Sequence, residues 1–206
     1  MEDSGIYIII THPALPYRTI AEECVSMGIK MLQLREKDLP DRELLKIAKE
    51  LREITRGTQT SLVINDRPDI AALCQADYLH IGQSDIPIEE ARKIVGDMKI
   101  GLSTHSIVQV KEALTKNPDY IGFGPVFPTP TKAIADPAVG TELIKEVMSI
   151  SNVPVVVLGG LFPANISSVI KAGAKNVALV RYFMETKDFK GRIQIIKDKL
   201  KQSHML

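Results

Sequence analysis

The sequence predicts an α/β protein, a single-domain (β/α)8 TIM barrel over residues 1–206, on three observations. Short β-branched segments alternate with amphipathic segments along the whole chain, which is typical of parallel β/α units. Eight such units leave about 26 residues each, enough for one strand, one helix and two turns. The G-x-G-x-x-G turn of a dinucleotide-binding open sheet is missing after the first strand, which disfavours the alternative doubly wound sheet.

Eight strands are expected, each a short run rich in β-branched and other apolar residues. They span 6–11, 30–35, 61–66, 78–82, 99–104, 120–124, 154–160 and 176–182. The clearest helix lies at 41–56, where Leu44, Ala48 and Leu51 recur at helical spacing and charged residues take the other face. The longest irregular segment, 125–139, carries four prolines and is expected to close over a ligand.

Composition and charge exclude several classes of function. The chain has 26 Lys and Arg against 25 Asp and Glu, and a nucleic-acid partner would need a strong basic excess. The two cysteines, Cys24 and Cys74, form no C-x-x-C pair, so neither a zinc framework nor a disulfide-rich scaffold is expected. No apolar run approaches the roughly 18 residues of a membrane span. A cytoplasmic protein without a membrane anchor is expected, with a homo-oligomer left open.

The C-terminal ends of the strands carry the chemistry in such a barrel, so polar residues there are the site candidates. After the second strand, alternation places Gln33, Arg35 and Lys37 on one side and Leu34 and Glu36 on the other. Two cations and an amide should therefore face the barrel mouth together. The competing interpretation is that Arg35 and Lys37 are solvated rim charges.

Two carboxylates follow neighbouring strands, Asp66 after the third and Asp85 after the fourth. Hard oxygen ligands without a His or Cys cluster suit Mg²⁺ shared with a substrate phosphate. Helix capping would explain either aspartate alone, since each precedes a predicted helix. Helix capping explains less well why both aspartates occur close to Arg35 and Lys37.

Further anion-binding groups are expected around the mouth. Ser103 lies at the end of the fifth strand, and the long loop contains Thr129, Thr131 and Lys132. These groups would add donors to the same anion pocket, and we expect a mobile segment to deliver Lys132. His105 is a weaker acid–base candidate, because it begins a helix and would fit on the rim. His80, inside a strand, is expected to be packed or hydrogen-bonded.

Gly159 and Gly160 end the seventh strand just before a helix. Such glycines let backbone N–H groups approach an anion, and the loops after strands seven and eight of barrels commonly bind phosphate. A cationic, metal-binding side and a neutral phosphate cup would suit two small phosphorylated substrates. Loss of a diphosphate leaving group needs charge neutralisation, which Arg35, Lys37, Lys132 and a metal would supply.

Five motifs occur together along the chain: QLREK at 33–37, NDR at 65–67, HIGQSD at 80–85, GFGPVFPTPTK at 122–132 and GG at 159–160. Their order and spacing resemble the thiamine phosphate synthase family over nearly all the chain. The resemblance implies a (β/α)8 barrel that couples 4-amino-5-hydroxymethyl-2-methylpyrimidine diphosphate with 4-methyl-5-(2-hydroxyethyl)thiazole phosphate. The pyrimidine diphosphate would ionise first, and the thiazole nitrogen would capture the carbocation.

The resemblance also implies roles for individual residues. Gln33 would contact the pyrimidine, and Ser103 would lie near the pyrimidine or the diphosphate. Asp66 and Asp85 would bind Mg²⁺. The diphosphate would be held by Arg35, Lys37, Asn65 and Lys132, and the thiazole phosphate by Thr129, Thr131 and the Gly160 amide. The catalytic candidates are therefore Arg35, Ser103 and Lys132.

The end of the eighth strand departs from the family pattern. Synthases usually carry a small Ser-Ala-Ile type segment there, whereas this chain has Arg181-Tyr182-Phe183. Arg181 would bind the thiazole phosphate more strongly through its planar fork, or its bulk would fill the cup and displace the thiazole. Both alternatives stay open at this point.

Tautomerase-type relatives act on a thiazole carboxylate phosphate and do not join two substrates. They tend to lose the glutamine of the strand-two motif and the aspartate after strand four, and to carry a histidine near the start of the long loop. Gln33, Asp85 and Pro125 in this chain favour a synthase. An isomerase that uses a residue such as His105, and a non-catalytic barrel that binds a thiamine precursor, are the alternatives.

Overall fold

The computed structural model describes residues 5–129 and 137–204, and in these ranges eight parallel strands close into a barrel. Each strand pairs with the next, and β8 pairs with β1 to complete the ring. The strands are β1 (Gly5–Ile10), β2 (Met31–Leu34), β3 (Ser61–Asn65), β4 (Tyr78–Ile81), β5 (Lys99–Thr104), β6 (Tyr120–Phe123), β7 (Val155–Leu158) and β8 (Asn176–Leu179). The predicted barrel is confirmed.

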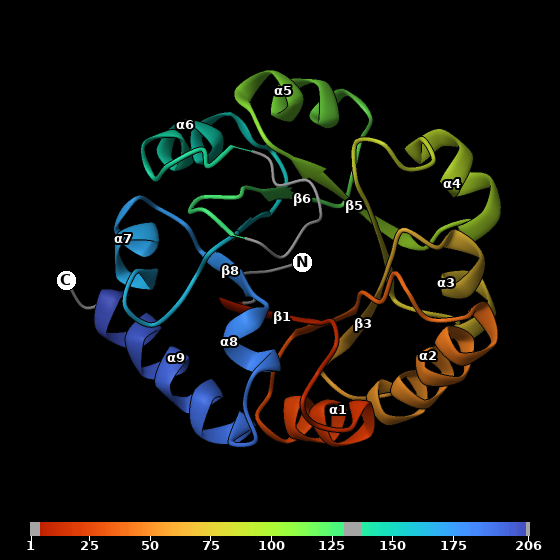
Figure 1. Cartoon of the computed structure of the whole chain (residues 1–206). Helices are drawn as coiled ribbons and strands as arrows, with labels where there is room; N and C mark the ends of the chain where they lie inside the picture. Colours follow the sequence, from red (N-terminus) through yellow and green to blue (C-terminus); the bar gives the residue numbers. More distant parts are fainter. Residues whose placement is uncertain (1–4, 130–136, 205–206) are drawn as a thin grey trace.

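Helices surround the strands as an outer ring (Figure 1). They are α1 (Tyr17–Ser26), α2 (Asp41–Thr55), α3 (Pro68–Cys74), α4 (Ile88–Val95), α5 (Ile107–Thr115), α6 (Glu142–Ile150), α7 (Ile166–Lys171), α8 (Arg181–Met184) and α9 (Phe189–His204). The helix predicted at 41–56 is α2, and its predicted apolar positions Leu44, Ala48 and Leu51 are buried. Within the described ranges, no helix has the length and apolar character that crossing a membrane requires.

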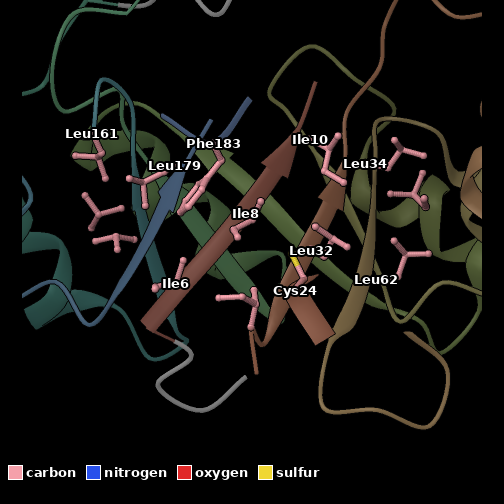
Figure 2. Close-up of a cluster of buried hydrophobic side chains, with 14 of the residues drawn as sticks. Ile6, Ile8, Ile10, Cys24, Leu32, Leu34, Leu62, Leu161, Leu179 and Phe183 are labelled. Carbon is pink, nitrogen blue, oxygen red and sulfur yellow. The ribbon is translucent and has the colours of Figure 1, made fainter. Parts of the chain in front are cut away.

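The main core fills the layer between the strands and the helices. Ile6, Ile8 and Ile10 of β1 project into it, and Phe183 of α8 packs there as well (Figure 2). Because both faces of a parallel sheet are covered, its strands read as nearly continuous apolar runs. The alternate side chains of each strand, which point away from the helices, fill the barrel interior.

A second cluster fills the inside of the barrel with inward-facing residues. The ring of Tyr120 packs edge-on against Tyr7 and Tyr78, with centroid separations of 6.1 and 5.9 Å. Gly101 on β5 makes room for it, since a Cβ there would lie 2.1 Å from Cζ of Tyr120. The interior is therefore a packed floor, and the ligand space lies above it at the C-terminal ends of the strands.

The predictions for the seventh and eighth strands extended too far along the chain. β7 ends at Leu158, because Gly159 and Gly160 take φ values of +97° and +63°, outside the β region. β8 ends at Leu179, and the segment expected to finish that strand instead forms the single helical turn α8. An apolar run does not by itself mark the point where the backbone leaves the sheet.

The long loop is attached to the β7–α7 turn at its start. Val126 N–H donates to the carbonyl of Leu158 at 2.9 Å, and Phe127 N–H donates to that of Gly159 at 3.1 Å. Val139 N–H returns to the carbonyl of Pro125 at 2.8 Å, which closes the base of the loop. Residues 130–136, with Thr131 and Lys132, lie outside the described residues, so closure over a ligand stays a prediction.

Overpacking at Gly101 should destabilise the barrel. We expect Gly101→Ala to lower the free energy of unfolding by about 1–3 kcal/mol, because the new methyl group would overlap the Tyr120 ring. Gly122→Ala on the neighbouring strand is the matched control, since its Cβ would meet His80 and Leu158 at 3.4 Å. Urea unfolding of both variants is the measurement, and an equal or smaller loss for Gly101→Ala would contradict the packing account.

Candidate active site

One cavity of about 680 Å³ lies at the C-terminal ends of the strands and collects most of the predicted site residues. The predicted site residues that line the cavity are Gln33, Arg35, Lys37, Asn65, Asp66, Asp85, Ser103, Thr129, Gly160 and Arg181. Thr131 and Lys132 fall outside the described residues. The cavity thus joins side chains from both halves of the chain in a space large enough for a small ligand.

The strand-two motif alternates as predicted. Gln33, Arg35 and Lys37 line the cavity, whereas Leu34 and Glu36 are buried on the opposite side. Arg35 is half-buried in the cavity wall, so the rim-charge interpretation does not describe it, whereas the Lys37 side chain is 54% exposed and lies at the rim. Two cations and an amide therefore face one space.

Glu36 ties this motif to the segment between β1 and α1, a role that the sequence did not predict. Its Oε1 accepts the backbone N–H of His12 at 2.6 Å and the hydroxyl of Tyr17 at 2.7 Å. Burial raises the pKa of Tyr17, and the hydrogen bond to Glu36 raises it further, so the phenol remains a donor. Glu36 thereby fixes the backbone between Arg35 and Lys37.

The two aspartates form an acidic pair next to Lys37. Nζ of Lys37 lies 2.9 Å from Oδ2 of Asp66, and the Gly82 N–H donates to Oδ2 of Asp85 at 2.7 Å. Burial raises the pKa of Asp85. Asp66 raises it further, through a side-chain hydrogen bond with Asp85 and through its negative charge. A cation beside both carboxylates would relieve that repulsion.

Helix capping does not explain either aspartate. α3 begins after Arg67 and α4 begins after Pro87, and neither helix has a side-chain capping hydrogen bond. Asp66 instead takes a left-handed φ of 58°, which turns the chain sharply at the end of β3. Both aspartates line the cavity, where Asp66 pairs with Lys37 and Asp85 accepts from the Gly82 N–H.

The two carboxylates suit a hard cation that takes only part of its ligands from the protein. No group of three or more His, Cys, Asp and Glu residues in the described ranges could enclose a metal ion. Mg²⁺ is commonly held by one or two carboxylates and completes its octahedron with water and substrate phosphate oxygens. Asp66 and Asp85 match that pattern.

Histidines and a serine line the β4–β6 side of the cavity. His80 is hydrogen-bonded as predicted, through Nε2 to Oγ of Ser103 at 2.8 Å, and it also reaches the cavity. His105 lines the cavity, and its Nδ1 donates to the carbonyl of Gly124. This bond holds the His105 ring against the start of the long loop.

The opposite wall combines the glycine turn with Arg181 and Phe162. A Cβ on Gly160 would lie 2.7 Å from Cβ of Phe127 and 2.9 Å from two carbonyl oxygens, so glycine is required where the loops touch. Cζ of Arg181 lies 5.2 Å from the centre of the Phe162 ring. Phe162 was not singled out from the sequence, because nothing in the β7–α7 segment marks it as facing Arg181.

The bulky segment at the end of β8 does not fill the cup as a whole. Phe183 is 1% exposed in the outer core, and Tyr182 packs against Arg192, whose Cζ lies 4.8 Å from its ring centre. Of these three residues, only Arg181 lines the cavity. The departure from the family pattern therefore adds one cation to the wall.

The fold and the cavity define the class of the protein, a (β/α)8 barrel enzyme with its site at the C-terminal ends of the strands. Residues 6–183 match the family described as thiamine monophosphate synthase, and the chain belongs to that family.

Two curated relatives and one solved structure agree with this assignment. The thiamine-phosphate synthase of Dictyoglomus thermophilum is 41% identical over 170 residues, covering 82% of this chain and 76% of the relative. That of Halalkalibacterium halodurans is 36% identical over 207 positions and covers 98% of both chains. The structure of thiamine phosphate pyrophosphorylase from Pyrococcus furiosus has a TM-score of 0.87 at 30% identity, covering 98% of this chain and 97% of that one.

Replacing Asp85 should stabilise the metal-free protein at high pH. Because folding raises the pKa of Asp85, the folded state favours its protonated form, and that favourable contribution is lost as the pH rises through this pKa. We expect Asp85→Asn to unfold at a higher temperature than the wild type at pH 8 in EDTA, with the difference shrinking toward acid pH.

Thermal unfolding from pH 8 to pH 4 measures this difference. Asp97→Asn, at an exposed position in the turn after α4, is the control and should leave the profile unchanged. An Asp85→Asn variant that is no more stable than the wild type at pH 8 would contradict a raised pKa of Asp85 in the folded protein.

Proposed function

We propose that the protein is a thiamine phosphate synthase, a transferase that forms a C–N bond with loss of diphosphate. Its substrates would be 4-amino-5-hydroxymethyl-2-methylpyrimidine diphosphate and 4-methyl-5-(2-hydroxyethyl)thiazole phosphate. The observation that carries this proposal is that one cavity in a chain of this family combines a basic motif, an aspartate pair and a glycine turn. One barrel domain would suffice for the reaction.

The basic side of the cavity suits the leaving diphosphate. Arg35, Lys37 and Asn65 line one wall, and Lys132 from the long loop would join them. Negative charge grows on the diphosphate as the bond to the pyrimidine methylene breaks, so fixed cations lower the barrier to ionisation. Lys37 pairs with Asp66 in the structure and would exchange part of that contact for the phosphate oxygens.

The aspartate pair suits Mg²⁺ as cofactor. Asp66 and Asp85 would hold the ion, which supplies further charge neutralisation at the diphosphate when bound. The raised pKa of Asp85 supports this role, since burial, and then the neighbouring Asp66, disfavour its ionised form when no cation lies beside it. Metal affinity should therefore fall when either carboxylate is lost.

The remaining groups would orient the two rings and the second phosphate. Gln33 and Ser103 would contact the pyrimidine. The thiazole phosphate would lie against Gly160, Arg181, Thr129 and Thr131. Arg181 would add a charge-assisted contact to a cup that is usually neutral in the family. A cytoplasmic location fits two buried, unbridged cysteines.

A synthase assay tests the proposed function. Purified protein with both substrates and Mg²⁺ should form thiamine phosphate, and omission of the metal or of either substrate should abolish it. Asp85→Ala should remove the metal-dependent turnover. Conversion of a single thiazole substrate without metal would identify a tautomerase, and ligand binding without turnover would identify a non-catalytic barrel.

Arg181 should contribute specifically to thiazole phosphate binding. We expect Arg181→Ser to raise KM for the thiazole phosphate by about tenfold or more, because a charge-assisted hydrogen bond is lost. KM for the pyrimidine diphosphate should stay the same, and Arg181→Lys should recover part of the loss. Steady-state kinetics with each substrate varied measure both constants, and a fall in KM for Arg181→Ser would show that the arginine obstructs the cup.

A further inference from the structure

A chain of buried hydrogen bonds runs beneath the cavity from Gln33 to Ser103. Nε2 of Gln33 donates to the hydroxyl of Tyr7 at 2.7 Å, and that hydroxyl lies 2.9 Å from the hydroxyl of Tyr120. The Tyr120 hydroxyl lies 2.8 Å from Nδ1 of His80, whose Nε2 lies 2.8 Å from Oγ of Ser103. Five strands thus contribute to one connected network.

The barrel floor is shaped to hold this chain. The imidazole of His80 stacks on the ring of Tyr120 with 5.4 Å between centroids and 24° between planes. Gly101 leaves the space that the Tyr120 ring occupies, since a Cβ there would lie 2.1 Å from Cζ of Tyr120. Both tyrosines are almost completely buried, so water does not compete for their hydroxyl groups.

The first link sets the direction of the chain, because an amide nitrogen can only donate. Burial raises the pKa of Tyr7 and of Tyr120, so both phenols keep their protons. The Tyr7 hydroxyl accepts from Gln33, so within this series of hydrogen bonds its own hydrogen can only go to Tyr120. The Tyr120 hydroxyl then donates its hydrogen to Nδ1 of His80. The imidazole then carries its proton on Nε2 and donates to Ser103.

We propose that Tyr7, Tyr120 and His80 are positioning residues that present Gln33 to the ligand as an acceptor and Ser103 as a donor. The inference rests on the proposed function, in which these two side chains contact the aminopyrimidine. The Gln33 carbonyl oxygen, left by the bond from Nε2 to Tyr7, matches an exocyclic amine. The Ser103 hydroxyl hydrogen, left by acceptance from His80, matches an unprotonated ring nitrogen.

This polarity selects amino over oxo heterocycles. A 4-oxo ring presents a carbonyl oxygen and a ring N–H where the amino ring presents N–H and a ring nitrogen. Its carbonyl oxygen would face the Gln33 carbonyl oxygen, and the Ser103 hydroxyl hydrogen would lose the ring nitrogen as its acceptor. Reversal would require every link from Gln33 to Ser103 to change together. A site with buried, ordered hydrogen-bonding groups rejects the reversed pattern because it leaves those groups unpaired.

Tyr120→Phe tests the inference by cutting the chain at its centre while keeping the ring. We expect KM for the pyrimidine diphosphate to rise about tenfold, with KM for the thiazole phosphate changed less than about twofold. Tyr78→Phe is the matched control: its ring is 5.9 Å from that of Tyr120, but its hydroxyl accepts from Lys99 at 3.4 Å, off the chain. Tyr78→Phe should change neither constant.

Tyr7→Phe cuts the chain one link earlier and should give the same split between the two KM values. It also serves if Tyr120→Phe fails to fold. Unchanged KM for the pyrimidine diphosphate in both variants, or an equal rise for both substrates, would overturn the positioning role.

Nitrogen-15 NMR of His80 provides a readout that does not depend on turnover. The wild type should show a neutral imidazole protonated on Nε2, and Tyr120→Phe should give a mixture of tautomers. A wild-type imidazole protonated on Nδ1 would overturn the inference. If the wild type forms no thiamine phosphate, the proposed function fails. The His80 tautomer would still decide whether the hydrogen bonds run in the direction from Gln33 to Ser103.

Discussion

Closure of eight parallel strands into a barrel is the constraint on which the rest of the structure depends. It directs all the strand C-termini to one end, so residues far apart in the chain meet around one cavity. Tyr7 and Tyr120, for example, are 113 residues apart and share a hydrogen bond. Strict alternation along each strand then divides the side chains between the outer core and the interior.

Buried polar contacts give the cavity its chemical order. Glu36 fixes the backbone that carries Arg35 and Lys37, and the chain beneath the cavity fixes Gln33 and Ser103. The aspartate pair is different, since its members repel each other and are balanced in part by Lys37. Groups held in place by hydrogen bonds thus surround the aspartate pair, whose negative charges are only partly neutralised. This arrangement suits a ligand that brings its own cation.

Much of this arrangement follows from the sequence alone, because alternation and strand order need no coordinates. The QLREK motif was enough to predict which of its side chains face the cavity, and Asp66 and Asp85 were predicted as a pair. The ends of β7 and β8 were not, since positive φ at Gly159 and the turn at Val180 depend on neighbouring loops. The contacts of Tyr120 were missed because they require the closed barrel, although a Tyr at an inward strand position was a usable signal.

In the proposed reaction, the aspartate pair and the basic motif act together on one diphosphate within the cavity. A crystal structure with Mn²⁺, diphosphate and thiamine phosphate, recorded with anomalous scattering from manganese, tests it most directly. We expect a manganese peak within coordinating distance of Asp66 and Asp85, bridged to diphosphate oxygens that contact Arg35 and Lys37. A manganese ion bound elsewhere, or a diphosphate on the Arg181 side of the cavity, would contradict it.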